Sequence, residues 1–202
     1  MAPTYKLMYY NAPGIAEPIR YLLCYGGIDF EDFRFGRDGM ADLKPKLPFG
    51  QVPVLEIDGK QAYQSLAICR YLAHQFKLCG ADAWENMEID SIVDTINDFR
   101  IKMFMYYYEP NPEVKEKNKG PLFAETVPYY LGRFEKIAEA NNGHLAVGKL
   151  TWADFYFTAL LDNLNPYFGK PVVEGYPNLE RVSKNVTSLP AIKDWIEKHP
   201  PK

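Results

Sequence analysis

Hydrophobic and polar positions predict strands and helices in turn over the first 78 residues. Segment 5–10 is short and rich in aromatic residues, which is typical of a strand, and the residues Asn-Ala-Pro-Gly at 11–14 end it. Segment 16–25 has apolar residues at helical spacing, and two glycines follow it. Phenylalanines alternate with acidic residues over 29–35, which predicts a second strand.

A hairpin and a helix follow. Segments 53–57 and 60–63 resemble strands, and the Asp-Gly pair between them is favoured in tight hairpin turns. Segment 65–76 carries an apolar stripe at helical spacing. The order is strand, helix, strand, a short linking helix, then two strands and a helix. This order predicts an α/β domain with a mixed sheet flanked by helices.

From residue 83 onward the pattern is helical. The stretch 84–108 has few helix breakers, and further helices are expected at 122–140, 152–168, 178–185 and 190–198. We interpret the charged segment 110–120 as a solvated turn. The expected organisation is an α/β domain at 1–78, a linker at 79–82 and an all-α domain at 83–202.

One helix start in the second domain has a capping signature. Thr151 occupies the expected N-cap position and Asp154 the third helical position, while Leu150 and Phe155 are placed to form a hydrophobic staple. We interpret this group as serving folding alone.

Composition and charge exclude several classes of protein. The formal net charge of −3, without a run of Lys and Arg, argues against nucleic-acid binding. No segment is apolar enough to span a membrane, and the first residues lack a signal-peptide pattern. Three cysteines without a Cys-x-x-Cys pair indicate reduced thiols. We therefore expect a cytoplasmic protein with no membrane and no nucleic-acid partner.

The segment 48–55 (PFGQVPVL) is the first with a chemical implication. Pro53 opens a predicted strand, and the Val52–Pro53 bond is a candidate cis peptide. A cis bond would turn the Val52 backbone outward, where an extended peptide ligand could pair with it as an added strand. The alternative is that Pro53 simply begins an edge strand.

Gln64 and Ser65 lie where the hairpin ends and a helix begins. Ser65 could cap its own helix. Alternatively, the free N–H groups and the positive end of the helix dipole could bind a carboxylate, with the Ser65 hydroxyl as an additional donor.

Tyr9 ends the first strand just before the loop at 11–14, so its phenol could donate a hydrogen bond to a thiolate. A free cysteine-type thiol has a pKa of about 8.5. Lowering that pKa by two units requires about 2.7 kcal/mol, and one hydrogen bond to a charged group supplies roughly 1.5–3 kcal/mol. The alternative is that Tyr9 is a packing residue.

Three carboxylates on the long helix follow each other at four-residue intervals. We consider three interpretations of these carboxylates: a solvated helix face, a partner for a ligand ammonium group, or a weak Mg²⁺ or Ca²⁺ site. The three histidines are scattered without metal-ligand spacing, so we expect no strong metal site. The carboxylates are Asp90, Asp94 and Asp98.

Together these segments are similar to the cytosolic glutathione transferases, specifically the sigma class, which includes insect transferases and haematopoietic prostaglandin D synthase. The likeness runs from Tyr5 to Pro200, essentially the whole chain. Its most specific pieces are 5–10 (YKLMYY), 16–20 (AEPIR), 47–50 (LPFG), 53–59 (PVLEIDG), 64–65 (QS), 92–99 (IVDTINDF), 150–155 (LTWADF) and 189–192 (LPAI).

The resemblance implies a thioredoxin-like first domain, an all-helical second domain, a homodimer, and glutathione as co-substrate with no metal required. By position, Tyr9 would activate the glutathione sulfur, and Lys44 would reach the glycyl carboxylate. The backbone of Val52, beside Pro53, would pair with the cysteinyl unit. Gln64 and Ser65 of the same chain would hold the γ-glutamyl carboxylate. Asp98 of the partner subunit would hold the γ-glutamyl amino group.

Four positions depart from the family pattern. Ile15 replaces an arginine that many sigma-class members place near the sulfur. Met40 replaces a tryptophan beside the glycyl end, and Gln51 replaces a common lysine, so that end would be held more loosely. Asn97 replaces an aspartate near the metal site of the prostaglandin synthase. We do not interpret these departures as loss of activity.

The expected reaction is conjugation of the glutathione thiolate to small apolar electrophiles, which include lipid-peroxidation products and xenobiotics, with glutathione peroxidase activity as a further expectation. Its role would be detoxification. Two alternatives remain open, a glutathione-dependent prostaglandin isomerase and a non-catalytic structural protein of the crystallin type. The residues expected to line the electrophile pocket are Tyr10, Ala12, Pro13, Ile15, Phe104, Met105 and Tyr106.

Overall fold

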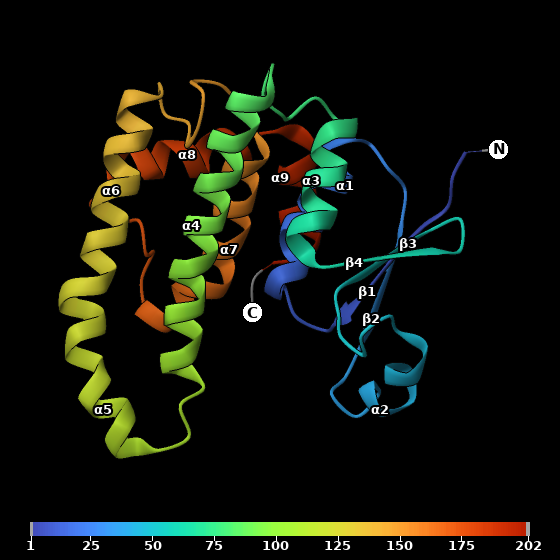
Figure 1. The fold of residues 1–202 in the computed structure, drawn as a ribbon, viewed down its shortest axis with the longest axis horizontal. Helices are drawn as coiled ribbons and strands as arrows, with labels where there is room; N and C mark the ends of the chain where they lie inside the picture. The colour runs from blue at the N-terminus through green and yellow to red at the C-terminus, as the bar shows by residue number, and fades with distance from the viewer. Residues whose placement is uncertain (1, 201–202) are drawn as a thin grey trace.

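A computed structural model of the protein describes residues 2–200 of the 202. Figure 1 shows two parts side by side, a column of long helices and a smaller part that contains the strands. No helix among residues 2–200 is long and apolar enough to cross a membrane.

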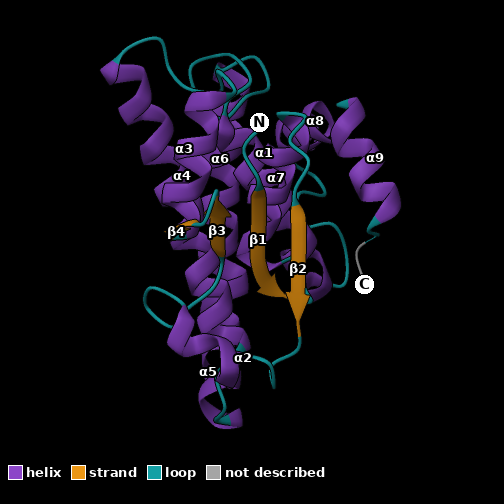
Figure 2. Ribbon diagram, turned by 90° about the vertical axis from the view of Figure 1, so that its right-hand side faces the viewer, coloured by secondary structure: helices purple, strands orange, loops and turns teal. Residues whose placement is uncertain are grey.

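The sheet has four strands in the order β2-β1-β3-β4. They are β1 (Tyr5–Tyr10), β2 (Glu31–Phe35), β3 (Val54–Ile57) and β4 (Lys60–Tyr63). β1 is parallel to β2 and antiparallel to β3, and β3 and β4 form the hairpin. Its turn residues Asp58 and Gly59 have φ of 49° and 79°, as a tight two-residue turn requires. Figure 2 shows this sheet in front of the helices. The predicted mixed sheet is confirmed.

Apolar side chains along the central strands point alternately to the two faces of the sheet. Leu7 and Leu55 are paired and belong to the main core with residues of α1 (Glu17–Tyr25) and α3 (Ser65–Gln75). Their neighbours Met8 and Val54 point to the opposite face. There they form a small second cluster beside the segment of α2 (Met40–Leu43) and the 3₁₀ turn η2 (Lys44–Lys46).

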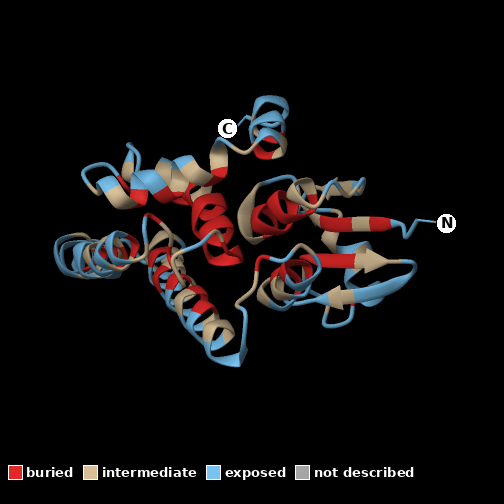
Figure 3. Ribbon diagram, turned by 90° about the horizontal axis from the view of Figure 1, so that it is seen from above, coloured by how far each residue is buried: buried red, intermediate tan, exposed pale blue. Residues whose placement is uncertain are grey.

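The second part is all helical, as predicted. α7 (Trp152–Phe168) is buried along most of its length and packs against α1 of the sheet domain. Figure 3 shows the buried residues gathered at the centre of the molecule, between the two parts. The surrounding elements are α4 (Ala83–Tyr107), α5 (Pro112–Pro121), the π-helical turn η3 (Leu122–Thr126), α6 (Val127–Ala140), α8 (Pro177–Thr187) and α9 (Pro190–Lys198).

The interpretation of 110–120 as a solvated turn is wrong, because most of it is the helix α5. The Asn111 side chain caps this helix, accepting hydrogen bonds from the backbone nitrogens of Glu113 and Val114 at 3.0 and 3.4 Å. Pro112 occupies the first turn, where its missing N–H is no loss. α5 buries none of its residues, so it has no apolar stripe from which periodicity could predict it.

The predicted capping box at the start of α7 is present. Asp154 Oδ2 accepts from the backbone nitrogen of Thr151 at 2.8 Å, and Asp154 Oδ1 accepts from that of Leu145 at 2.8 Å. The Asp154 side chain is fully buried. It therefore joins the start of the central helix to the preceding loop.

Candidate functional site

Three element ends meet at one side of the sheet. The end of β1 supplies Tyr9, the bend before β3 supplies Val52 and Pro53, and the start of α3 supplies Ser65. Two cavities lie here. One of about 740 Å³ is lined partly by residues 9–12 and Gly14, and one of about 80 Å³ is lined by Ile15 and by residues before β3 and at the start of α3.

The smaller cavity brings together most of the residues expected to hold the γ-glutamyl and cysteinyl units. The Val52–Pro53 bond is cis. Gln64, at the N-cap position of α3, has φ of 70°. Residues other than glycine seldom adopt this backbone conformation, and it is often found at binding sites. The lining residues are Ile15, Phe49, Gln51, Val52, Pro53, Tyr63, Gln64 and Ser65.

Ser65 does not cap its own helix. It is the first residue of α3, and Gln64 in the N-cap position makes no side-chain capping bond. The N–H groups of the first turn of α3 are therefore free of a side-chain cap and border the smaller cavity. A carboxylate is the group that such a helix end favours.

Tyr9 has the geometry of a hydrogen-bond donor. Its hydroxyl oxygen accepts from the backbone nitrogen of Ile15 at 3.4 Å, which leaves the hydroxyl proton free to be donated. Burial raises the pKa of the Tyr9 phenol above its ordinary value of 10.0, although the Ile15 bond and the charges of Arg20 and Arg100 act in the opposite direction. The phenol is therefore protonated at neutral pH.

The larger cavity has a largely aromatic wall. Phe104 and Tyr108 lie one turn apart at the end of α4, and Tyr167 comes from α7. Ala12 and Met40 also line it, while Pro13 lines a separate cavity on the other side of the 11–13 segment. The full lining is Tyr9, Tyr10, Asn11, Ala12, Gly14, Phe35, Gly36, Arg37, Met40, Phe104, Tyr108, Asn163 and Tyr167.

Four residues expected in this pocket lie elsewhere. Pro13 lines the separate cavity and Ile15 lines the smaller one. Met105 is 70% exposed, and Tyr106 packs edge-on against Phe123, with ring centroids 5.4 Å apart. Neither lines the larger cavity. On an α-helix, the neighbour of Phe104 on the same face is Tyr108, four residues on, and not the two residues that follow it.

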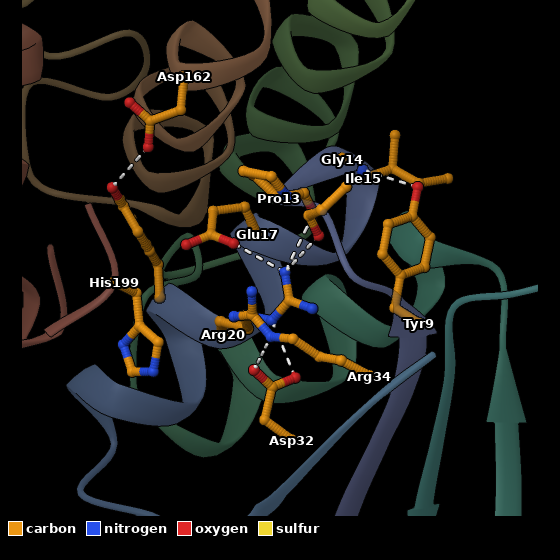
Figure 4. Close-up of polar contacts among 12 residues, drawn as sticks. Tyr9, Pro13, Gly14, Ile15, Glu17, Arg20, Asp32, Arg34, Asp162 and His199 are labelled. Atoms are coloured by element: carbon orange, nitrogen blue, oxygen red, sulfur yellow. Dashed lines mark hydrogen bonds and ion pairs between the residues drawn. The ribbon is translucent and has the colours of Figure 1, made fainter. Parts of the chain in front are cut away.

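The loop before α1 is held from inside by Arg20, which is fully buried (Figure 4). Its Nη1 donates to the carbonyl oxygens of Ala12 and Pro13, both at 3.1 Å, and to Glu17 Oε2 at 2.8 Å. Its Nε donates to Asp32 Oδ1 at 3.0 Å. The Arg20 charge is thus used to fix the loop and is balanced by two carboxylates.

Gly14, in the same loop, is held from the helical domain. Its backbone nitrogen donates to Asn163 Oδ1 at 2.8 Å, and its carbonyl oxygen accepts from Asn163 Nδ2 at 3.2 Å. No local sequence signal pointed to Asn163, because it lies 149 residues from Gly14 along the chain.

Lys44 and Asp98 lie outside both cavities. The Lys44 side chain passes beside Gly50, at the turn before Gln51. Asp98 is exposed on α4. Of the three spaced carboxylates, Asp90 is paired with Arg70, whose Nε is 3.0 Å from both carboxylate oxygens. Within residues 2–200, no three His, Cys, Asp or Glu side chains are grouped to hold a metal ion.

None of the three cysteines is a thiolate at neutral pH. Burial raises the pKa of Cys24 to about 12, and it also raises the pKa values of Cys69 and Cys79. All three are free thiols. A sulfur nucleophile at this site would therefore have to come from a ligand.

Comparison with known proteins identifies both parts of the chain. Residues 5–74 match the model of the glutathione S-transferase N-terminal domain, and residues 97–199 match that of the C-terminal domain. The chain is 49% identical over 197 residues to glutathione S-transferase S1 of Drosophila melanogaster, covering 98% of this chain and 79% of that one. It is 41% identical over 206 residues to hematopoietic prostaglandin D synthase of Gallus gallus, covering 98% of both. The solved structure of prostaglandin synthase D of Nilaparvata lugens superposes with a TM-score of 0.93, at 42% identity over 98% of both chains.

Proposed function

The chain belongs to the glutathione S-transferase family, and we propose that its Tyr9 hydroxyl activates the sulfur of bound glutathione for addition to apolar electrophiles. The observation that carries this proposal is the protonated Tyr9 phenol, whose oxygen accepts from Ile15 and whose proton remains available at the rim of the cleft.

The phenol stabilises the thiolate by donating its proton to the sulfur. A hydrogen bond to a charged group contributes roughly 1.5–3 kcal/mol, which is enough to lower the pKa of a thiol by one to two units. The Ile15 N–H, which donates to the phenol oxygen, polarises the hydroxyl further. Because Ile15 brings no positive charge, the stabilisation depends chiefly on Tyr9.

Glutathione would lie across the smaller cavity. Its γ-glutamyl carboxylate would bind at the uncapped start of α3 with Gln64 and Ser65, and its cysteinyl unit would pair with the backbone of Val52. Its glycyl end would lie towards Lys44, Gln51 and Met40.

The amino group of glutathione would pair with Asp98 of the partner subunit in a homodimer. Asp98 is exposed in the single chain, which leaves its carboxylate available to a second copy. We further propose that the enzyme is of the sigma class, is cytoplasmic, requires no metal and serves detoxification.

The electrophile would occupy the larger cavity. Its volume of about 740 Å³ lies within the usual range for small-molecule sites, and the aromatic rings of Tyr10, Phe104 and Tyr108 favour flat or extended apolar molecules. Unsaturated aldehydes from lipid peroxidation, organic hydroperoxides and aryl halides fit this description. In conjugation, the thiol loses its proton and a sulfur–carbon bond forms. An aryl halide then releases halide, while an unsaturated aldehyde takes up a proton at carbon.

The Tyr9→Phe variant tests the proposal. We expect its affinity for glutathione to stay within a few fold of wild type, because the other contacts remain. We expect the pKa of the bound thiol, measured by thiolate absorbance, to rise and the conjugation rate at neutral pH to fall at least tenfold. Tyr10→Phe, on the same strand, should leave the thiol pKa unchanged. An unaltered thiol pKa in Tyr9→Phe would show that Tyr9 is not the activator.

A second candidate is glutathione-dependent isomerisation of a prostaglandin endoperoxide. It is favoured by the 98% mutual coverage with a relative named hematopoietic prostaglandin D synthase, and it would use the same thiolate. A product assay with the endoperoxide decides between isomerisation and conjugation. Retention on a glutathione-affinity column would argue against a purely structural, crystallin-like role.

A further inference from the structure

We propose that Asn163, on α7 of the helical domain, is a positioning residue for the Tyr9 hydroxyl. It would act by fixing the peptide group between Gly14 and Ile15, whose N–H contacts the phenol oxygen. This inference rests on the proposed role of Tyr9 as the activator of sulfur.

The contacts form a continuous chain. Asn163 Nδ2 donates to the carbonyl oxygen of Gly14 at 3.2 Å, and the backbone nitrogen of Ile15 donates to Tyr9 Oη at 3.4 Å. The Gly14 carbonyl and the Ile15 N–H belong to one planar peptide unit and point in opposite directions. A side chain that fixes the direction of the carbonyl therefore also fixes the direction of the N–H.

Asn163 also restrains the preceding peptide, because its Oδ1 accepts from the backbone nitrogen of Gly14 at 2.8 Å. The two bonds hold the peptide groups on both sides of the Gly14 α-carbon. This restraint matters because glycine is the residue with the greatest backbone freedom, and Gly14 adopts φ of +54°. Arg20 holds the carbonyls of Ala12 and Pro13 but makes no bond to Gly14.

The position of Asn163 makes the helical domain part of the activating apparatus. Its neighbour Asp162 accepts a hydrogen bond from Tyr21 of α1 at 3.2 Å, so two consecutive residues of α7 contact the sheet domain. Asp162 contacts Tyr21 of α1, whereas Asn163 contacts Gly14 in the loop next to Tyr9. The orientation of the activating phenol thus depends on how α7 packs.

The test measures the pKa of the thiol of bound glutathione with no electrophile present. Asn163 lines the larger cavity, so a change in cavity size would affect electrophile binding but not this measurement. Asn163→Ala removes both bonds, and Asn163→Leu removes them while keeping the side-chain volume. In both we expect the thiol pKa to rise by about half a unit to one unit. We also expect kcat at pH 6.5 to fall about three- to tenfold and to recover towards wild type as the pH passes the shifted pKa.

The matched control is Asn165→Ala on the same helix. Asn165 Oδ1 accepts from the backbone nitrogen of Val172 at 2.9 Å, so this variant also loses a side chain to backbone bond but has no contact with the loop. Its thiol pKa should equal that of wild type.

A wild-type thiol pKa in both Asn163 variants would overturn the inference, as would an equal rise in Asn165→Ala. If Tyr9→Phe raises the thiol pKa while the Asn163 variants do not, only the role of Asn163 fails. If Tyr9→Phe also leaves it unchanged, the proposed function fails first.

Discussion

Gly14 lies so close to Tyr9 that a Cβ atom on residue 14 would overlap the phenol oxygen and stand 2.8 Å from the ring carbon Cζ. The loop and the phenol therefore occupy their positions only because residue 14 has no side chain. The φ of +54° at Gly14 adds a second reason for glycine there.

Gly14→Ala should therefore displace Tyr9. We expect kcat at neutral pH to fall at least tenfold, and the free energy of unfolding to fall by about 1 kcal/mol or more from the unfavourable φ alone. Gly27→Ala is the matched control, because Gly27 has φ of +65° and open space around the added Cβ. It should lose stability but keep kcat. Equal losses of kcat in the two variants would contradict this account.

The Asp162 carboxyl should make stability depend on pH. Burial, with a further contribution from the charge of Glu17, raises its pKa to about 6 against the ordinary value of 3.8, and the Tyr21 hydrogen bond opposes this only in part. Between these two values the folded state binds more protons than the unfolded state. The free energy of unfolding therefore falls as the pH rises through the window, by about 3 kcal/mol.

Asp162→Asn keeps an oxygen that can accept from Tyr21 and removes the charge. We expect its melting temperature to exceed that of wild type at pH 7.5 and to match it near pH 4. The exposed variant Glu197→Gln gives the baseline. A gain of equal size at both pH values would mean that packing, and not ionisation, is responsible.

Phe104 and Met105 provide a test of the electrophile cavity. Phe104 lines it, whereas the adjacent Met105 is 70% exposed. Phe104→Ala should raise KM for an apolar electrophile about three- to thirtyfold through lost apolar contact, with KM for glutathione nearly unchanged. Met105→Ala should alter neither constant. A larger effect from Met105→Ala would place the electrophile elsewhere.

Asp154 should be important for stability and not for chemistry. Its buried carboxylate accepts from the backbone nitrogens of Leu145 and Thr151, and Asp154→Ala leaves both donors without this partner. We expect the free energy of unfolding to fall by about 3 kcal/mol or more, as measured by chemical denaturation. Near-wild-type kcat in the folded fraction should accompany that loss. An unchanged denaturation midpoint would contradict it.

The sequence predicted the fold where a local signal decided the structure. The Asp-Gly pair at residue 58 marked the hairpin, and Thr151 and Asp154 marked the start of α7. Helix α5 was missed because it buries none of its residues and therefore has no apolar periodicity.

The candidate site was predictable where residues stand at the ends of elements. Tyr9 at the end of β1 and Ser65 at the start of α3 were predicted in this way, and each lines one of the two cavities. Asn163 and Tyr167 were not, because only the tertiary packing of α7 brings Asn163 to the loop and Tyr167 beside Phe104 of α4. Tyr108 could have been found from its spacing of four residues from Phe104.

The main hydrophobic cluster runs without a break from Leu7 in the sheet through α1 to Trp152 in α7. A chain cut at the linker that the sequence predicts at 79–82 would therefore expose apolar surface on both pieces. Each fragment produced alone should be prone to aggregate, whereas co-expression of the two should restore a glutathione-binding complex. Because both parts share one hydrophobic core, we expect them to unfold together in a single cooperative transition.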